Sequence, residues 1–222
     1  MNRLGIISYN ANHLKTEQII LNLLNRYDIR VYGLPFIARP SREILFQHRP
    51  DQTAGAHPAE LCSYYGFPFI PVDNDSEIDN GCDLYLIAGA GILSAKCLQG
   101  KRILNGHPGV IPAVRGLDAF KWSIFQSLPL GVTLHYIDES VDAGQILTIV
   151  PTPVFSSYTL ESAARRHYEN EIILLSNFEQ YLDCGKNPFR GIQPGESMRR
   201  MSYAQEQELK KKFELYKERF CG

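Results

Sequence analysis

Asn105 and His107 stand two positions apart, directly after the apolar run 102–104 and directly before a proline and a glycine. The apolar run predicts a strand that ends at this point. Because alternate residues of a strand point to the same face, the amide and the imidazole can project together. A second stretch, 131–144, alternates apolar and polar residues as a half-buried strand does, and then enters a polar turn that carries Asp142. The two stretches can therefore present an amide, an imidazole and a carboxylate at strand ends.

These three groups suit acyl transfer. The Asn105 amide can donate to a developing oxyanion, and the His107 imidazole can move protons. The Asp142 carboxylate can orient or charge that imidazole. Each residue also has a purely structural interpretation, because asparagine before glycine is typical of turns and aspartate beside glycine often caps its own backbone. The combination and its spacing favour chemistry over three independent structural roles.

The two stretches hold a longer pattern around these residues. It reads Asn105-x-His107-Pro108-Gly109-x-x-Pro112-x-x-Arg115-Gly116, then Gly131-Val132-Thr133-x-His135, then Asp138-Glu139-x-x-Asp142-x-Gly144. This pattern resembles the folate-dependent formyltransferase family, which includes the glycinamide ribonucleotide, methionyl-tRNA and sugar N-formyltransferases. The resemblance covers roughly residues 4–182 and is densest over 84–149.

The resemblance implies direct transfer of a formyl group from 10-formyltetrahydrofolate to a primary amine, without a covalent enzyme intermediate. In that scheme Asn105 binds the substrate groups and the forming oxyanion. His107, protonated near the transition state, stabilises the oxyanion and helps to shuttle a proton. Asp142 raises the pKa of His107 as a nearby opposite charge and can take the amine proton through water.

The same resemblance implies a pocket for the pterin of the formyl donor, lined by backbone groups after a buried strand. The expected donor-binding residues are Ala88, Gly89, Ala90, Gly91, Ile92, Leu93 and Asp138. Taken without the resemblance, the Gly-x-Gly at 89–91 favours a plain turn from a strand to a helix. The donor is the only cofactor expected, and no metal site is predicted.

The acceptor is less strongly indicated. In glycinamide ribonucleotide enzymes the turn after the first strand is glycine-rich and cradles a phosphate, whereas the matching turn here, 8–13, has no glycine. The transfer-RNA enzymes carry a further C-terminal domain of about 100 residues, and the tail here is far shorter. A nucleotide-linked amino sugar is therefore the favoured acceptor, with glycinamide ribonucleotide as the alternative. We expect Asn10, Asn12 and Arg115 to contact the acceptor.

Arg115 suits a diphosphate because its planar guanidinium binds phosphate through two parallel hydrogen bonds. The alternative is that it pairs with Asp118 or Glu139 and braces the turn. Two other protein classes also remain. One is a folate- or nucleotide-binding module without catalysis, which the complete set Asn105, His107 and Asp142 argues against. The other is a nicotinamide-dependent oxidoreductase, which the missing GxGxxG after the first strand argues against.

The surrounding pattern predicts an α/β fold, a Rossmann-like and mostly parallel sheet flanked by helices, with a short C-terminal helical appendage. We expect a catalytic domain at 1–183 and an appendage of turns and a helix at 184–222. The segment 38–58 reads as a long loop with at most one short helical turn. Helical periodicity is strongest over 160–182, and Ser202-x-x-Gln205 predicts a capping box at the start of the last helix. That helix could pack on the body, form a homodimer or close over substrate.

Composition excludes several classes of protein. The net charge of −1 and the lack of a basic stripe argue against nucleic-acid binding. The five cysteines show no paired spacing, so a zinc ribbon or a thioredoxin-type motif is not expected. No apolar run reaches membrane-spanning length and no signal peptide is visible. We therefore expect a cytoplasmic protein with reduced thiols, and the resemblance implies a small-molecule amine as its substrate.

Overall fold

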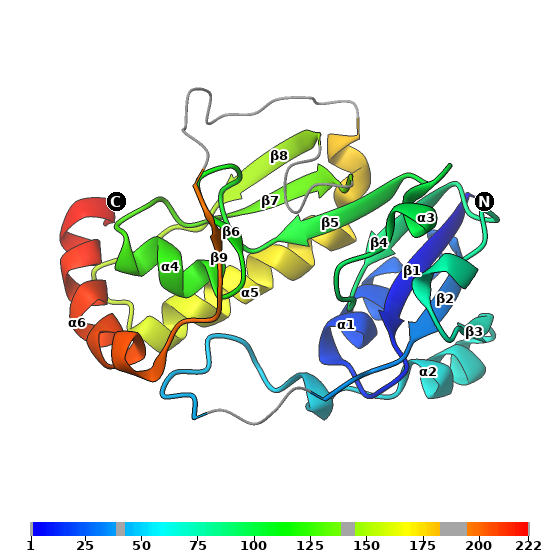
Figure 1. Cartoon of the computed structure of the whole chain (residues 1–222), viewed down its shortest axis with the longest axis horizontal. Helices are drawn as coiled ribbons and strands as arrows, with labels where there is room; N and C mark the ends of the chain where they lie inside the picture. The colour runs from blue at the N-terminus through cyan, green and yellow to red at the C-terminus, as the bar shows by residue number, and fades with distance from the viewer. Residues whose placement is uncertain (1, 39–42, 139–144, 183–194, 222) are drawn as a thin grey trace. The chain divides into compact units, whose positions relative to one another are not determined.

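The computed structural model describes residues 2–38, 43–138, 145–182 and 195–221. The chain forms two compact units. Unit 1 comprises Met1–Arg39, Asp51–Asn105 and Tyr136–Ser140, and unit 2 comprises Pro40–Pro50, Gly106–His135 and Val141–Gly222. One seven-stranded sheet has the order β3-β2-β1-β4-β5-β7-β8 (Figure 1). The expected α/β class, with a mostly parallel sheet flanked by helices, is confirmed.

Unit 1 holds the parallel part of the sheet and its helices. In chain order its elements are β1 (Arg3–Tyr9), α1 (Leu14–Leu23), β2 (Asp28–Leu34), η1 (Gln52–Ala54), α2 (Pro58–Tyr65), β3 (Phe69–Pro71), η2 (Asp75–Glu77), β4 (Leu84–Ile87), α3 (Ala95–Leu98) and the start of β5 (Ile103–His107). The pairs β1–β2, β1–β4, β2–β3 and β4–β5 are all parallel. The central strand β1 has five consecutive buried residues, as a strand covered on both faces requires. The short helix α3 was not predicted, because a single turn leaves almost no periodic signal.

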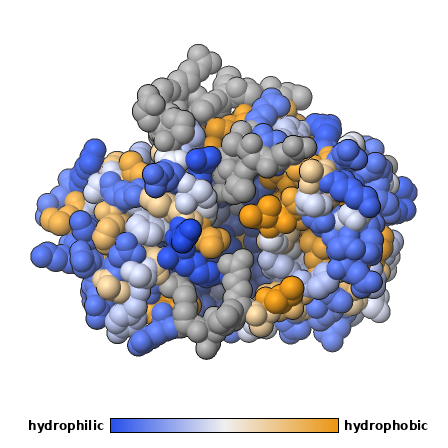
Figure 2. Space-filling view, in the orientation of Figure 1, coloured by the Kyte–Doolittle hydropathy of each residue, from blue (hydrophilic) through white to orange (hydrophobic). Residues whose placement is uncertain are grey.

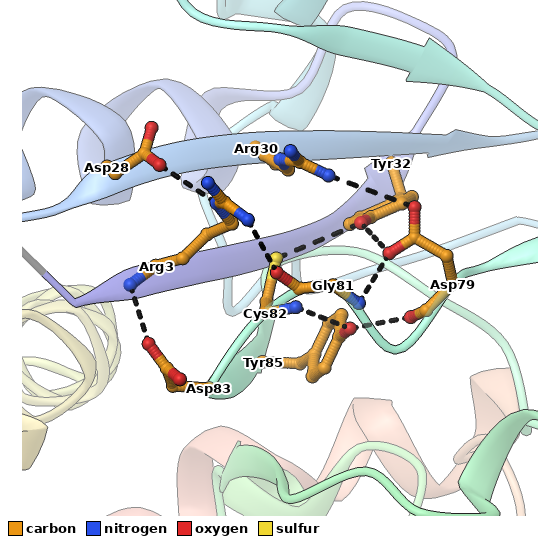
Figure 3. Close-up of polar contacts among 9 residues, drawn as sticks. All are labelled: Arg3, Asp28, Arg30, Tyr32, Asp79, Gly81, Cys82, Asp83 and Tyr85. Carbon is orange, nitrogen blue, oxygen red and sulfur yellow. Dashed lines mark hydrogen bonds and ion pairs between the residues drawn. The ribbon is translucent and has the colours of Figure 1, made fainter.

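A network of polar contacts ties together the beginnings of these strands (Figure 3). The Asp79 carboxylate accepts hydrogen bonds from the Tyr32 hydroxyl, at 2.8 Å, and from the Gly81 amide, at 2.7 Å. The Tyr85 hydroxyl donates to the Asp79 carbonyl at 2.6 Å and accepts from the Cys82 amide at 3.2 Å. Burial raises the pKa of Tyr85 to about 12 and also raises that of the Cys82 thiol. These contacts link β2 and β4 to the segment that precedes β4.

Unit 2 contains the antiparallel part of the sheet and the longest helices. Its elements are the end of β5, β6 (Arg115–Gly116), α4 (Ala119–Phe125), β7 (Gly131–Tyr136), β8 (Ile146–Pro151), α5 (Leu160–Ser176), η3 (Phe178–Tyr181), β9 (Ser197–Met198) and α6 (Tyr203–Phe220). β7 pairs with β8 in antiparallel fashion, and β6 and β9 form a separate parallel pair. The stripe predicted to run to residue 182 is a helix only to Ser176. The side chain of Asn177 donates to the Ile173 carbonyl at 2.8 Å, which caps the helix end.

The last helix, α6, packs within unit 2. Its predicted capping box is present, with Ser202 and Gln205 exchanging hydrogen bonds. Leu209 and Phe213 are buried against α4, and the Tyr216 hydroxyl donates to the Leu128 carbonyl at 2.9 Å. Figure 1 shows α6 (red) beside α4. Of the three arrangements considered for this helix, packing on the body is therefore observed.

Residues 43–50, which we call the docking segment, lie on the helices of unit 2. The Glu206 carboxylate of α6 accepts hydrogen bonds from the backbone amides of Leu45, at 2.7 Å, and Phe46, at 3.3 Å. The other oxygen of Glu206 meets the Lys121 ammonium of α4 at 2.5 Å, and both side chains are almost fully buried. The ring of His48 stacks parallel to that of Phe120 at 6.0 Å. Part of the predicted long loop is thus ordered by a buried ion pair.

Figure 2 shows apolar side chains in orange among hydrophilic ones in blue on the visible face. Within the described residues, no helix combines the length and the apolarity that crossing a lipid bilayer requires.

Candidate active site

Strand β5 carries both residues of the predicted amide and imidazole pair. It runs through Gly106 to His107, three residues beyond the end of its apolar run, and Pro108 follows it. Asn105 is half-buried and ends the part of β5 in unit 1, while His107 is only 3% exposed and lies in unit 2. Their spacing within one strand gives both side chains the same face of β5.

The His107 ring has a defined orientation. Its Nε2 lies 2.9 Å from the Val114 carbonyl oxygen. Because a carbonyl can only accept, Nε2 must carry the proton, so Nδ1 is the nitrogen that can gain or lose a proton in chemistry. Gly109 makes this contact sterically possible, since a Cβ at that position would lie 2.8 Å from Nε2 and from the same carbonyl.

The loop that presents the Val114 carbonyl is anchored to β7 by one buried hydroxyl. Thr133 donates to the Gly109 carbonyl at 2.6 Å and accepts from the Ile111 amide at 3.1 Å. The Val114 amide closes the loop by donating to the Val110 carbonyl at 2.9 Å. Sequence reasoning included Gly109 and Thr133 in the matching pattern but gave them no role. Their presence in the matching pattern was the sequence signal for a role of these two residues. Their contacts with the loop around the Val114 carbonyl explain that role.

His167 of α5 supports the same loop and was missed altogether. Its Nε2 lies 3.1 Å from the Pro108 carbonyl and its Nδ1 lies 2.8 Å from the Thr152 hydroxyl. The carbonyl requires a donor, so Nε2 is protonated and Nδ1 accepts from Thr152. Burial lowers the pKa of His167 to about 4, which keeps the ring neutral at pH 7. Its position in an apolar helical stripe gave no sign of these contacts.

The lowered pKa of His167 predicts a stability that depends on pH. Below about pH 6.5 the unfolded chain takes up a proton that the folded protein accepts only near pH 4, so stability falls as pH decreases through this window. We expect wild-type unfolding free energy to drop by about 2 kcal/mol more between pH 7 and pH 5 than that of a His167→Gln variant. Urea unfolding at the two pH values checks this, and equal losses in both proteins would contradict it.

In unit 1 the predicted donor segment turns back over the sheet. The amides of Ala88 and Gly89 both donate to the Ile7 carbonyl, at 2.9 and 3.1 Å. Gly89 is required by packing, because a Cβ there would lie 2.8 Å from the His13 ring and 2.9 Å from the Tyr9 ring. A Cβ at Gly91, in contrast, would meet no atom within 4 Å. Of the two glycines, only Gly91 thus presents open backbone.

Asp138 lies close to this segment within unit 1. Ala90 and Leu93 pack against the buried cluster that contains Ile103, and so does Ile137, which immediately precedes Asp138. The Ile137 amide donates to the Ile103 carbonyl at 3.0 Å, and the Asp138 side chain is exposed. Residues of the segment 88–93 and the neighbour of Asp138 thus pack against the same buried cluster, and their role in donor binding stays a prediction. Asp142, the predicted carboxylate, lies outside the described residues.

The three predicted acceptor residues lie in two places. Asn10 and Asn12 are exposed in the turn after β1, where the Asn10 amide donates to the Leu34 carbonyl at 2.7 Å. Arg115 is in unit 2, and its Nε and Nη2 both donate to the Gly195 carbonyl, at 3.2 and 2.8 Å. The Arg115 side chain therefore binds the Gly195 carbonyl, in addition to the backbone pairing of β6 with β9.

Comparisons with known proteins find similarity to formyl transferases. Residues 77–178 match the family model described as formyl transferase. The chain is 33% identical over 95 residues to phosphoribosylglycinamide formyltransferase of Bacillus subtilis, a match covering 40% of this chain and 49% of that protein. The corresponding Haemophilus influenzae enzyme is 33% identical over 93 residues, with 40% and 44% covered. The chain thus spans about half the length of these relatives.

Solved structures share the fold at low sequence identity. A sugar N-formyltransferase from Shewanella sp FDAARGOS_354 is 20% identical, with a TM-score of 0.59, 96% of this chain and 88% of that chain covered. Phosphoribosylglycinamide formyltransferase from Streptococcus pneumoniae TIGR4 is 19% identical, with a TM-score of 0.57 and 82% and 99% covered. Residues 77–178, which include Asn105 and His107, are therefore similar in sequence to the formyl transferases, and the solved structures share the fold of the chain.

Proposed function

We propose that this chain is an N-formyltransferase that moves a formyl group from 10-formyltetrahydrofolate to the primary amine of a nucleotide-linked amino sugar. The transfer step is supported by the place of Asn105 and His107 two positions apart on β5, since alternate residues of a strand point to the same face. The Val114 carbonyl holds the imidazole of His107 in one tautomer at 2.9 Å. An amide donor and an oriented imidazole are the groups that a tetrahedral oxyanion intermediate needs.

In the proposed reaction the amine nitrogen attacks the formyl carbon and its carbonyl electrons move to the oxygen. Asn105 donates to that oxygen, and His107 in its protonated form stabilises it. Asp142 keeps His107 charged and accepts the proton that leaves the amine, through water. Collapse of the intermediate breaks the carbon bond to N10 of the folate, which takes up a proton. The products are the formamide and tetrahydrofolate.

The proposed donor site uses the backbone of residues 88–93 together with Asp138. Replacing Gly91 by Val should weaken folate binding at least tenfold while leaving the fold intact, because the new side chain enters open space beside that backbone. Ala204→Val, at an exposed position of α6, is the matched control. Fluorescence titration with folic acid measures both variants. Unchanged affinity in a folded Gly91→Val protein would place the donor elsewhere.

The choice of an amino sugar rests on the turn after β1, which lacks the glycines of the phosphate-binding turn that the resemblance implies for glycinamide ribonucleotide enzymes. Arg115 is the proposed diphosphate contact. Three of its five N–H donors take no part in the two hydrogen bonds to Gly195.

A direct assay tests both the reaction and the acceptor. The protein is incubated with 10-formyltetrahydrofolate and either a panel of aminosugar nucleotides or glycinamide ribonucleotide, and products are identified by mass. We expect one sugar nucleotide to gain a formyl group. Efficient formylation of glycinamide ribonucleotide alone would overturn the assignment of an amino sugar as acceptor. It would leave the proposed formyl transfer standing. No formylated product from any amine would favour a binding module.

A further inference from the structure

Two imidazole rings hold the two ends of one loop in unit 2. Residues 108–114, which we call the His107 loop, follow β5 directly. At the far end of this loop, the Val114 carbonyl accepts from Nε2 of His107 at 2.9 Å. At the near end, the Pro108 carbonyl accepts from Nε2 of His167, on α5, at 3.1 Å. The carbonyl that orients His107 therefore belongs to a loop whose start is held by His167.

The His167 ring is itself fixed by the residues around it. Its Nδ1 accepts from the Thr152 hydroxyl at 2.8 Å, and the Asn170 side chain donates to the same hydroxyl oxygen at 3.3 Å. His167 and Thr152 are only 3% and 5% exposed. Both ring nitrogens of His167 thus have a partner, which gives the buried ring one orientation. Without this ring, the Pro108 carbonyl would lose the donor that holds the start of the loop.

The docking segment reaches the same ring through Phe120 of α4. The Phe120 ring lies 5.3 Å from that of His167, and the ring of His48 stacks on it at 6.0 Å. Arg49 forms an ion pair with Glu171, which lies one helical turn after His167 on α5. Burial lowers the pKa of His48 and of His167, so both rings are neutral at pH 7. The segment that contributes His48 and Arg49 therefore covers the surroundings of His167.

The charge of His167 affects its neighbour His107. The two rings are close enough for a charge on one to disfavour a charge on the other. Burial has the largest effect on the pKa of His167 and lowers it, and Arg49 acts in the same direction, whereas the Pro108 carbonyl and the Glu171 carboxylate oppose them. A neutral ring can hold the loop beside a protonated His107, whereas a second imidazolium would repel it.

We propose that His167 is a positioning residue for formyl transfer. Its ring holds the Pro108 end of the His107 loop and thereby fixes the carbonyl that orients the His107 imidazole. The docking segment keeps the His167 ring uncharged beside His107. The effect on turnover rests on the proposed function, whereas the orientation of His107 is measurable without any substrate.

Proton exchange at His107 measures its orientation directly. The Nε2 proton of His107 is buried and hydrogen-bonded, so nitrogen-edited NMR of the full chain should show it. His167→Leu should speed its exchange with water by about tenfold or more, because the Val114 carbonyl is no longer held in place. His167→Gln should keep slow exchange, since its amide nitrogen can donate to Pro108 and its oxygen can accept from Thr152.

Turnover should follow the same pattern. His167→Leu should lower kcat by roughly 10–10²-fold, as the displacement of a catalytic group does, and should leave the affinity for folic acid unchanged. His167→Gln should recover most of the rate. Ile172→Ala, at a 7% exposed position of the same helix, is the matched control and should lower stability without lowering kcat. In a His107→Ala background, His167→Leu should cause no further loss, because the ring that it positions is absent.

The role of the docking segment has its own measurement. His48→Ala removes the ring that covers Phe120, so water should reach His167 and raise its pKa from about 4 toward the usual value. NMR titration of the His167 ring follows this change. His57→Ala, in unit 1, is the matched control and should leave the titration of His167 unchanged. An unchanged pKa of His167 in the His48→Ala protein would contradict the role of the docking segment.

Two results would overturn the positioning role. One is unchanged proton exchange at His107 in a folded His167→Leu protein, and the other is a loss of kcat that persists in full when His107 is absent. If His167→Leu does not fold, Thr152→Val permits the same tests, since it removes the hydroxyl that fixes the ring. Faster exchange at His107 without formylation of any amine would support the orientation by His167 and refute the proposed function.

Discussion

His107→Ala should lower kcat/KM for formyl transfer by roughly 10²–10⁴-fold, the range lost with a general acid–base group or one oxyanion-stabilising donor. The imidazole is held with Nε2 against the Val114 carbonyl at 2.9 Å, so the substitution removes an oriented proton carrier. Asn105→Ala and Asp142→Ala should each cause a comparable loss. Steady-state kinetics with 10-formyltetrahydrofolate and the accepted amine measure all three.

The His107→Ala variant also permits a rescue experiment, because removing the buried ring leaves room for a small base. Added imidazole should restore part of the lost rate without changing the wild-type rate. Circular dichroism and thermal unfolding confirm that the fold persists. Near-wild-type turnover by His107→Ala would refute the proposed mechanism.

Glu206→Ala should lower the free energy of unfolding by about 3–5 kcal/mol, because it leaves the Lys121 ammonium buried without its counter-charge. The two groups meet at 2.5 Å and their side chains are 1% and 0% exposed. Burial alone would raise the pKa of Glu206, but hydrogen bonds from Lys121 and from the amides of Leu45 and Phe46 outweigh it and hold the pKa below its usual range. Removal of the carboxylate thus affects α4, α6 and the docking segment together.

Two comparisons separate the buried charge from the lost hydrogen bonds. Lys121→Met combined with Glu206→Gln removes both charges but keeps an amide oxygen for Leu45 and Phe46, so it should cost less than Glu206→Ala alone. Glu169→Ala breaks a half-exposed pair with Arg166, at 3.2 Å, and should cost less than about 1 kcal/mol. Urea unfolding measures each variant. If Glu206→Ala and Glu169→Ala lower the free energy of unfolding equally, burial does not raise the cost of breaking the Glu206–Lys121 pair.

Local sequence signals predicted most of the elements correctly. Helix α2 spans Pro58–Tyr65, and the sequence marks both of its ends with a proline in the first turn and a glycine after the last. The capping box of Ser202 and Gln205 was likewise readable, since it needs only a spacing of three residues. Asn105 and His107 were found for the same reason, as their shared face follows from the period of a strand.

Contacts between distant segments could not be read in this way. The carbonyl that orients His107 belongs to Val114, a residue whose side chain carries no chemical signal, and the hydroxyl that holds its loop comes from Thr133 on another strand. The two halves of the loop 38–58 also belong to different units, residues 43–50 to unit 2 and residues 51–57 to unit 1. Such partners are chosen by tertiary packing.

The sequence by itself determined the α/β class, the similarity to the formyl transferases and the place of Asn105 and His107 on one strand, because each depends on residue type and short-range spacing. Only the tertiary structure decided that His107 keeps its proton on Nε2, that the neutral His167 supports the same loop, and that Glu206 joins three segments. It alone also showed that the Lys15 amide in the first turn of α1 donates to the Gln52 side chain. These features depend on which groups are buried against one another, and burial sets both the protonation state of a side chain and the free energy of leaving it without a partner.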